Sequence, residues 1–224
     1  MRKVAVVTGC SYGLGHEISN RLIDEGYFVY GISRSKPPLD LSSYPDTFQW
    51  VECDISKAKE VENAFIKIGT YFDVLVNNAG VYEWGVFKHD SSPHMIDRMI
   101  DTNVKGTMYV THQALKTMKE NSDIFFINSV AGLSEIEYEA VYAASKHAIT
   151  AFAGILGQEL NNQLQKIRVT SIHPGGMNTP MQKDHPHKDR FMDPKEVVDM
   201  MMHVLKSKSR YKTIKMFPEF EWHE

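Results

Sequence analysis

The sequence is poor in several features that would place it in a specialised class of protein. Its two cysteines, Cys10 and Cys53, have the spacing of neither a metal site nor a redox pair, and they favour a reducing compartment such as the cytoplasm. No apolar run approaches the ~20 residues of a membrane span, and the start "MRKVAVVTG" indicates a strand rather than a signal peptide. The net charge of −3 gives no basic surface for nucleic acid. We therefore expect no nucleic-acid or membrane partner.

The composition itself is that of an ordinary globular chain. Hydrophobic residues make up 42% and charged residues 24% of the 224 positions, which is enough for a full core. We find no internal repeat, low-complexity segment or linker, so we expect a single domain over residues 1–224.

Short β-rich runs alternate with longer amphipathic stretches along the chain. The runs are apolar through their length, as in parallel strands covered on both faces. This predicts an α/β fold with a doubly wound parallel sheet of about seven strands flanked by helices. Expected strands are 3–9, 27–33, 48–54, 73–80, 123–129, 167–176 and 212–217; expected helices are 15–26, 59–72, one or two within 92–120 broken near "DTNVKG", 140–160 and 193–206, with a loop at 35–46.

A glycine-rich turn, "TGCSYGLG", joins the first expected strand to the first expected helix. Gly9, Gly13 and Gly15 would let the backbone approach a dinucleotide pyrophosphate at the helix N-terminus. The spacing is G-x-x-x-G-x-G rather than G-x-G-x-x-G, and a turn that binds nothing is the alternative.

The second expected strand ends in basic rather than acidic residues. An acid at this place would bind the adenosine ribose, whereas an arginine accommodates a 2′-phosphate. The chain has Ser33, Arg34 and Lys36, with no acid before Asp40. The pattern favours NADP(H) over NAD(H), and a solvated basic residue is the alternative.

Further polar residues follow other strands at the same edge of the sheet. Asp54 ends the third strand and "NNAG" (77–80) ends the fourth, where ligands of parallel sheets bind. A helix cap and ordinary turn chemistry are the alternatives for these two sites.

Tyr142 and Lys146 lie four residues apart and would share one face of a helix. Asn103 and Ser129 precede them at element ends. Taken singly, these residues also fit an amphipathic helix with a snorkelling lysine, a helix-breaking asparagine and a capping serine. An ammonium beside a phenol lowers the phenol pKa, which would make Tyr142 a general acid and base.

Together these motifs resemble the short-chain dehydrogenase/reductase family, which has a Rossmann-like fold. The resemblance covers residues 3 to about 180 and departs from the family in the Pro-rich segment after the second strand and in the short part beyond Thr179. It is carried by Thr8-Gly9-x-x-x-Gly13-x-Gly15, Asn77-Asn78-Ala79-Gly80, Asn103, Ser129, Tyr142-x-x-x-Lys146 and Pro174-Gly175-x-x-x-Thr179.

The resemblance implies an NADP(H)-dependent oxidoreductase acting between a carbonyl and a secondary alcohol of a small molecule. Tyr142 would exchange the proton, Ser129 would bind the substrate oxygen, and Lys146 would also bind the nicotinamide ribose. Asn103 would hold a water in a proton relay. The implied cofactor-binding residues are Gly9, Ser11, Tyr12, Gly13, Leu14, Gly15, Ser33, Arg34, Asp54, Ile55, Asn78, Ala79, Gly80, Tyr142, Lys146, Pro174, Gly175, Met177 and Thr179.

Two other functions fit parts of the pattern. One is a non-catalytic NADP(H)-binding redox sensor, for which the Ser129, Tyr142 and Lys146 set would be unnecessary. The other is a nucleotide-sugar epimerase or dehydratase, for which the roughly 45 residues after Thr179 are too few.

The substrate side is less determined by the sequence. Residues 180–192 would form a short lid, and the loop histidines His185 and His187 lack a third metal ligand. Tyr82, Trp84 and Phe87 line an apolar wall or belong to the core. Glu135, Glu137 and Glu139 would disfavour an anionic carrier protein, or are solvated loop charges.

The helix 140–160 carries an apolar stripe, Ala148, Ala151, Phe152, Ile155 and Leu156. Family members commonly pair this helix and the 103–119 helix across a two-fold axis. The resemblance implies a homodimer or homotetramer, and a buried helix in a monomer is the alternative.

Overall fold

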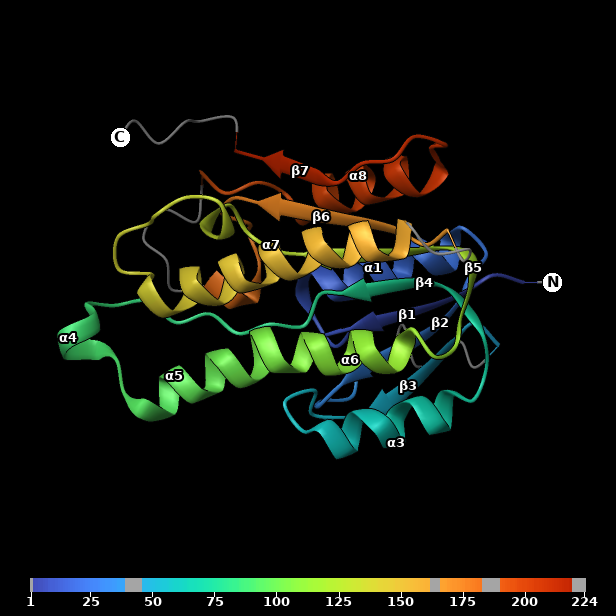
Figure 1. The fold of residues 1–224 in the computed structure, drawn as a ribbon, viewed down its shortest axis with the longest axis horizontal. Coiled ribbons are helices and arrows are strands. Elements are labelled where there is room, and N and C mark those ends of the chain that lie inside the picture. The colour runs from blue at the N-terminus through green and yellow to red at the C-terminus, as the bar shows by residue number, and fades with distance from the viewer. Residues whose placement is uncertain (1, 39–45, 162–165, 183–189, 219–224) are drawn as a thin grey trace.

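The protein is described here by a computed structural model, which covers residues 2–38, 46–161, 166–182 and 190–218. Seven parallel strands form one sheet in the order β3-β2-β1-β4-β5-β6-β7 (Figure 1). The strands are β1 Val4–Thr8, β2 Phe28–Ser33, β3 Phe48–Glu52, β4 Phe72–Asn77, β5 Met118–Ile127, β6 Arg168–Pro174 and β7 Thr213–Met216.

Helices cover both faces of this sheet, as the apolar strands predict. The helical elements are α1 Gly13–Asp24, α3 Ala58–Ile68, α4 Phe87–Asp90, α5 Pro93–Met99, the π-helix η1 Ile100–Gly106, α6 Thr107–Ala114, the 3₁₀ turns η2 Val130–Gly132 and η3 Pro180–Gln182, α7 Ala140–Asn161 and α8 Pro194–Lys206. Helices α1 and α8 pack on one face, and α3, α6 and α7 pack on the other. The predicted doubly wound α/β fold is confirmed.

Side chains of β1 contribute to the hydrophobic cores on both faces of the sheet. Ala5 and Val7 belong to the core under α1 and α8, and Val6 belongs to the core under α3, α6 and α7. All three are fully buried. Because both faces of the strand are covered, its sequence does not alternate between apolar and polar residues.

The strand order reverses direction between β1 and β4, which are neighbours in the sheet but not in the chain. The carboxyl ends of parallel strands diverge at such a point and leave a crevice for a ligand. All the strand arrows in Figure 1 point toward this edge, and α4 and α5 extend beyond it.

Several expected boundaries were wrong. The helix expected at 59–72 ends at Ile68, because Gly69 takes the left-handed conformation (φ 55°) and ends it, and Phe72 begins β4. The strand expected at 123–129 is longer at its start, since Met118 already pairs with Phe72 before a register shift. The helical run after Pro93 is not broken at "DTNVKG"; it continues there as the π-helix η1.

Candidate active site

The glycine-rich turn is built so that the backbone of three segments meets closely. Gly9 has φ +71°, and a Cβ on Gly15 would lie 2.1 Å from the Gly9 carbonyl oxygen and 2.4 Å from Asn78 Nδ2. Only glycine fits at position 15 without displacement. The turn therefore leaves the N-terminus of α1 open for an anion such as a pyrophosphate.

Asn78 ties this turn to the end of β4. Its side-chain amide donates to the carbonyl oxygens of Thr8 (2.9 Å) and Gly9 (3.3 Å). In return the Thr8 hydroxyl accepts from the backbone N–H groups of Asn78 and Ala79, both at 3.0 Å. The ends of β1 and β4 are thus fixed relative to each other at the crevice.

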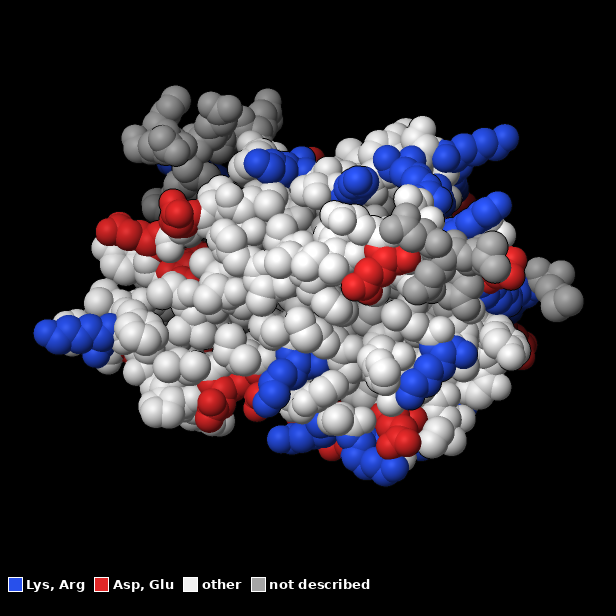
Figure 2. Space-filling view, viewed as in Figure 1, with Lys and Arg blue, Asp and Glu red and all other residues white. Residues whose placement is uncertain are grey.

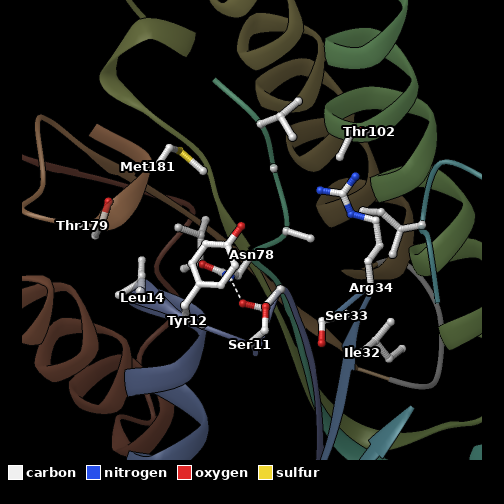
Figure 3. Close-up of a pocket in the computed structure, with 18 of the residues that line it drawn as sticks. Ser11, Tyr12, Leu14, Ile32, Ser33, Arg34, Asn78, Thr102, Thr179 and Met181 are labelled. Carbon is white, nitrogen blue, oxygen red and sulfur yellow. Dashed lines mark hydrogen bonds between the residues drawn. The ribbon is translucent and has the colours of Figure 1, made fainter. Parts of the chain in front are cut away.

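A cavity of about 1080 Å³, its open mouth included, follows this edge of the sheet (Figure 3). Among the predicted cofactor-binding residues, those that line it are Gly9, Ser11, Tyr12, Gly13, Leu14, Gly15, Ser33, Arg34, Asp54, Ile55, Asn78, Ala79, Gly80, Tyr142, Lys146, Met177 and Thr179.

Pro174 and Gly175 do not line this cavity. Pro174 ends β6, and the Gly175 N–H donates to the Met216 carbonyl at 2.8 Å, so this pair continues the sheet toward β7. Sequence reasoning missed other lining residues, among them Thr102 and Asn128. Thr102 precedes the asparagine of the motif and Asn128 precedes the serine, so both could have been found as neighbours of motif residues.

The end of β2 presents Arg34 to the cavity. Arg34 is exposed, has no hydrogen bond or ion pair within the described residues, and lines the cavity (Figure 3). The Ser33 hydroxyl is already hydrogen-bonded within the protein. It donates to the Ser35 carbonyl at 2.8 Å, and Trp50 Nε1 lies 3.1 Å away. The guanidinium is thus the free donor here, and the serine hydroxyl is not.

Two side chains close to the end of β2, those of Asp54 and Cys10, contact other groups of the protein. Asp54 Oδ1 accepts from the Ser56 N–H at 3.0 Å, which forms a turn and not the helix cap that was the alternative, because α3 begins at Ala58. Asp54 also lines the cavity. Cys10 Sγ lies 3.3 Å from Ser33 Oγ, and burial raises the pKa of the Cys10 thiol to about 11.

Asn103 sits in the middle of the π-helix η1 and is buried. Its Oδ1 accepts from the Val81 N–H at 2.8 Å, and its Nδ2 donates to the Val81 carbonyl (2.9 Å) and to Ser145 Oγ (3.1 Å). Both amide hydrogens are therefore used by the protein. π-Turns occur often at functional sites, and this one delivers an asparagine to the segment after β4.

Ser129 stands two residues beyond β5, which ends at Ile127, and begins the 3₁₀ turn η2. Its hydroxyl oxygen accepts from the Ala131 N–H at 3.2 Å, as a cap does. Its carbonyl accepts from Nδ1 of the buried His173 at 2.9 Å. Since a carbonyl cannot donate, this contact places the ring proton of His173 on Nδ1.

Tyr142 and Lys146 share one face of α7, as their spacing predicts, and both are buried. The ammonium lies 5.6 Å from the centre of the Tyr142 ring and donates to the Ile127 carbonyl at 3.3 Å. Burial lowers the Lys146 pKa to about 8.

The expected lowering of the Tyr142 pKa by Lys146 is not what the structure gives. Burial raises the Tyr142 pKa well above its usual range, a hydrogen bond with Ser129 lowers it in part, and the Glu139 charge raises it again. The sequence argument weighed one neighbouring charge and left out desolvation, which is the larger effect here.

The residues predicted around the substrate separate into different environments. Trp84 and Phe87 are 55% and 56% exposed, so they do not belong to the core. Tyr82 is partly buried, and its hydroxyl donates to Glu139 Oε1 at 2.7 Å. Glu135 and Glu137 are exposed.

The segment expected to form a lid is described only in part. Pro180 and Met181 of η3 line the cavity, whereas His185 and His187 lie outside the described residues. Elsewhere in the described ranges, no group of three or more His, Cys, Asp or Glu side chains could hold a metal ion. No helix among these residues is long and apolar enough to cross a membrane.

Comparison with known proteins agrees with this arrangement. The family model for short chain dehydrogenases matches residues 3–190. Farnesol dehydrogenase of Aedes aegypti is 36% identical over 192 residues, which cover 79% of this chain and 78% of the relative. Dehydrogenase/reductase SDR family member 11 of Gallus gallus is 33% identical over 193 residues, with coverage of 79% and 75%.

Solved structures show the same fold. A short chain dehydrogenase from Burkholderia cenocepacia in complex with NADP superposes with a TM-score of 0.87 at 23% identity, covering 96% of both chains. The 3-ketoacyl-(acyl-carrier-protein) reductase of Brucella melitensis complexed with NADH has a TM-score of 0.84 at 25% identity, covering 95% of this chain and 96% of that one. The chain belongs to the short-chain dehydrogenase family of NAD(P)-binding oxidoreductases, which interconvert alcohol and carbonyl groups of small molecules.

Proposed function

We propose that the protein is an NADP(H)-dependent reductase of apolar carbonyl compounds, and of the corresponding alcohols in reverse, with Tyr142 as the general acid and base. The observation that carries this proposal is that Tyr142 and Lys146 are both buried on one face of α7 and line the dinucleotide cavity. Ser129, which follows the lining residue Asn128, does not line the cavity itself but hydrogen-bonds Tyr142.

The residues present fit a nicotinamide dinucleotide. Gly9 and Gly15 let the turn approach the segment after β4 closely at the α1 N-terminus, and Arg34, which has no partner among the described residues, lines the cavity at the end of β2. When bound, the nicotinamide supplies the hydride for reduction and receives it in oxidation.

In carbonyl reduction, the protein supplies position, hydrogen bonds and one proton. The Ser129 hydroxyl hydrogen-bonds the substrate oxygen as negative charge develops there. The Tyr142 hydroxyl gives its proton to that oxygen, which completes the alcohol and leaves a tyrosinate. In alcohol oxidation the same proton returns to Tyr142.

The pKa directions suit this order of events. Burial keeps the Tyr142 phenol protonated, which is the form that reduction requires. Burial also brings the Lys146 pKa down to about 8, so its ammonium gives up a proton more easily than an exposed lysine and is a source from which the tyrosinate can be reprotonated.

The preference for NADP(H) rests on Arg34. Arginine presents a planar set of donors that matches phosphate, and Arg34, just after β2, has no partner in the part of the chain that the structure describes. Within the described residues no carboxylate ends β2, where NAD-binding sites place an acid for the ribose hydroxyl.

The apolar character of the substrate is supported by the surface beyond the site. Trp84, Val86 and Phe87 are exposed around α4, and Ile136 and Tyr138 are exposed before α7. The two segments lie side by side, since the Gly85 N–H donates to the Tyr138 carbonyl at 2.8 Å. The similarity to a farnesol dehydrogenase points to the same class of substrate.

The test is NADPH oxidation with farnesal, cyclohexanone, diacetyl and ethyl acetoacetate, and NADP reduction with farnesol. Tyr142→Phe should lower kcat by at least ~10², the usual contribution of a positioned acid, and Ser129→Ala should also impair turnover. Tyr71→Phe is the matched control, because Tyr71 is 65% exposed just before β4, at the opposite edge of the sheet. NADPH binding without turnover of any compound would favour the redox-sensor alternative.

We further propose that the protein forms a homodimer or homotetramer through α7. The predicted stripe is not one surface, because Leu156 is buried, Phe152 packs against the core, and Ala151 and Ile155 face outward. Gly154 adds to this outward face, and Figure 2 shows few charges over α7. A second copy fits an uncharged face with a 58% exposed isoleucine.

A further inference from the structure

A tyrosine and a carboxylate that no motif contains lie against Tyr142. The ring of Tyr82 meets the Tyr142 ring edge-on, with centroids 4.8 Å apart and planes at 85°. The Tyr82 hydroxyl donates to Glu139 Oε1 at 2.7 Å. Neither Tyr82 nor Glu139 lines the dinucleotide cavity, and Tyr82 packs against the buried cluster that contains Tyr142, Met95 and Met99.

The fold fixes this arrangement from both sides through Asn103. The Asn103 side chain holds the N–H and carbonyl of Val81, the residue before Tyr82, at 2.8 and 2.9 Å. It also donates to Ser145 Oγ at 3.1 Å, and the Ser145 hydroxyl donates to the Tyr142 carbonyl at 2.7 Å. One buried amide thus links the backbones that carry the two rings.

Glu139 differs from the other carboxylates of its loop. It is partly buried and bonded to Tyr82, whereas Glu135 and Glu137 are exposed and have no hydrogen bond among the described residues. Burial raises the Glu139 pKa, and the Tyr82 hydrogen bond acts against this and favours the charged carboxylate. That charge in turn raises the Tyr142 pKa.

Few other charged groups face Tyr142 from the packed elements. Lys146 lies on the same helix, and His173, behind Ser129 on β6, has its pKa lowered by burial. From α5 the buried contacts are the uncharged Met95 and Met99. The exposed pair Glu83 and Arg98 lies at the surface, where solvent screens it.

We propose that Tyr82 and Glu139 are positioning residues for Tyr142: the Tyr82 ring fixes the place of the catalytic ring, and the Glu139 carboxylate keeps negative charge beside it. Negative charge disfavours tyrosinate, so the pair keeps Tyr142 in the protonated form that carbonyl reduction requires. This inference rests on the proposed function, because it takes Tyr142 as the group that exchanges the proton.

Glu139→Gln separates charge from position, because the amide oxygen can still accept from Tyr82. Losing the charge should lower the apparent pKa of Tyr142 by about one unit, the ordinary scale for a neighbouring charge. Reduction requires the protonated phenol, so the alkaline fall in kcat/KM should move to lower pH by that amount. At lower pH the two proteins should converge, since Tyr142 is then protonated in both.

The measurement is the pH profile of kcat/KM with NADPH and farnesal, or with whichever carbonyl of the panel the wild type reduces fastest. The same shift should appear without substrate, as the onset of Tyr142 ionisation in NMR spectra of protein labelled at tyrosine Cζ; the resonance lost in Tyr142→Phe assigns it. Tyr82→Phe keeps the ring but removes the hydrogen bond that holds the Glu139 carboxylate. Its alkaline limb should therefore lie between those of the wild type and Glu139→Gln.

Glu137→Gln is the control, because it removes an exposed carboxylate of the same loop, and its profile should match the wild type. A Glu139→Gln profile and NMR onset that both coincide with those of Glu137→Gln would overturn the inference while leaving Tyr142 as the acid. Full activity of Tyr142→Phe would instead overturn the proposed function, and the inference with it.

Discussion

Replacement of Gly15 by alanine tests the geometry of the phosphate turn directly. The added Cβ would lie 2.1 Å from the Gly9 carbonyl oxygen, about 1.3 Å short of the 3.4 Å at which ordinary contacts begin. It would also lie 2.8 Å from the Gly9 carbonyl carbon, so a backbone segment and not a flexible side chain must move. Overpacking of this kind costs ~1–3 kcal/mol, only part of which the better helix propensity of alanine offsets.

The same displacement should damage cofactor binding more than it damages stability. Moving Gly9 by about an ångström withdraws backbone N–H groups from the pyrophosphate, and hydrogen bonds to charged groups contribute ~1.5–3 kcal/mol each. We expect Gly15→Ala to weaken NADPH binding by at least ~10² and to lower the free energy of unfolding by about 1–2 kcal/mol. NADPH fluorescence titration and urea denaturation measure the two effects.

Gly154→Ala is the matched control, because a Cβ at Gly154 meets nothing within 4 Å in the chain. It should leave NADPH affinity unchanged, because Gly154 lies on α7 and does not line the cavity. If Gly15→Ala kept wild-type affinity and stability, the close approach of Gly9 and Gly15 would have no part in binding, and the reasoning would be refuted.

Two further predictions concern the cofactor and the assembly. Arg34→Ala should weaken NADPH binding about ten- to a hundredfold and NADH binding far less, measured by fluorescence titration, since a charge-assisted bidentate contact contributes ~1.5–3 kcal/mol; equal wild-type affinity for the two cofactors would contradict this. Ile155→Glu should reduce the mass seen by light scattering to that of the 25.6 kDa chain, whereas Ile66→Glu, at a 68% exposed position of α3, should not. A monomeric wild type would refute the α7 interface.

The sequence was informative where the site depends on local pattern. Apolar strands and amphipathic helices predict the layers, and the carboxyl ends of parallel strands bring the turn at Gly9, the segment after β4 and the end of β2 to one edge. The spacing of Tyr142 and Lys146 on a helix predicts their shared face, and both line the cavity.

The parts of the site that the sequence did not predict depend on contacts between distant segments, and the spacing of residues within a motif does not reveal such contacts. Tyr82 and Glu139 are 57 positions apart, and neither belongs to a motif. Ser33 lines the cavity, but the hydrogen bond from its hydroxyl to the Ser35 carbonyl is a detail of loop geometry that the sequence does not reveal. The pKa of Tyr142 depends on how completely the fold removes it from water, which the identity of one neighbour does not tell.

The π-helix η1 connects α5 to α6 in one continuous helical run, and it changes the direction in which the side chains on either side of it point. Each α-helical residue turns the chain by about 100°, and a wider turn inserts an offset between the helix on its N-terminal side and the helix on its C-terminal side. Met95 and Met99 of α5 can therefore face the cluster around Tyr142, while Val110 and Ala114 of α6 face the sheet core. One helical run thus contributes to two buried clusters. A deletion within residues 100–106 that restored regular α-helix would turn either the α5 or the α6 side chains away from their cluster.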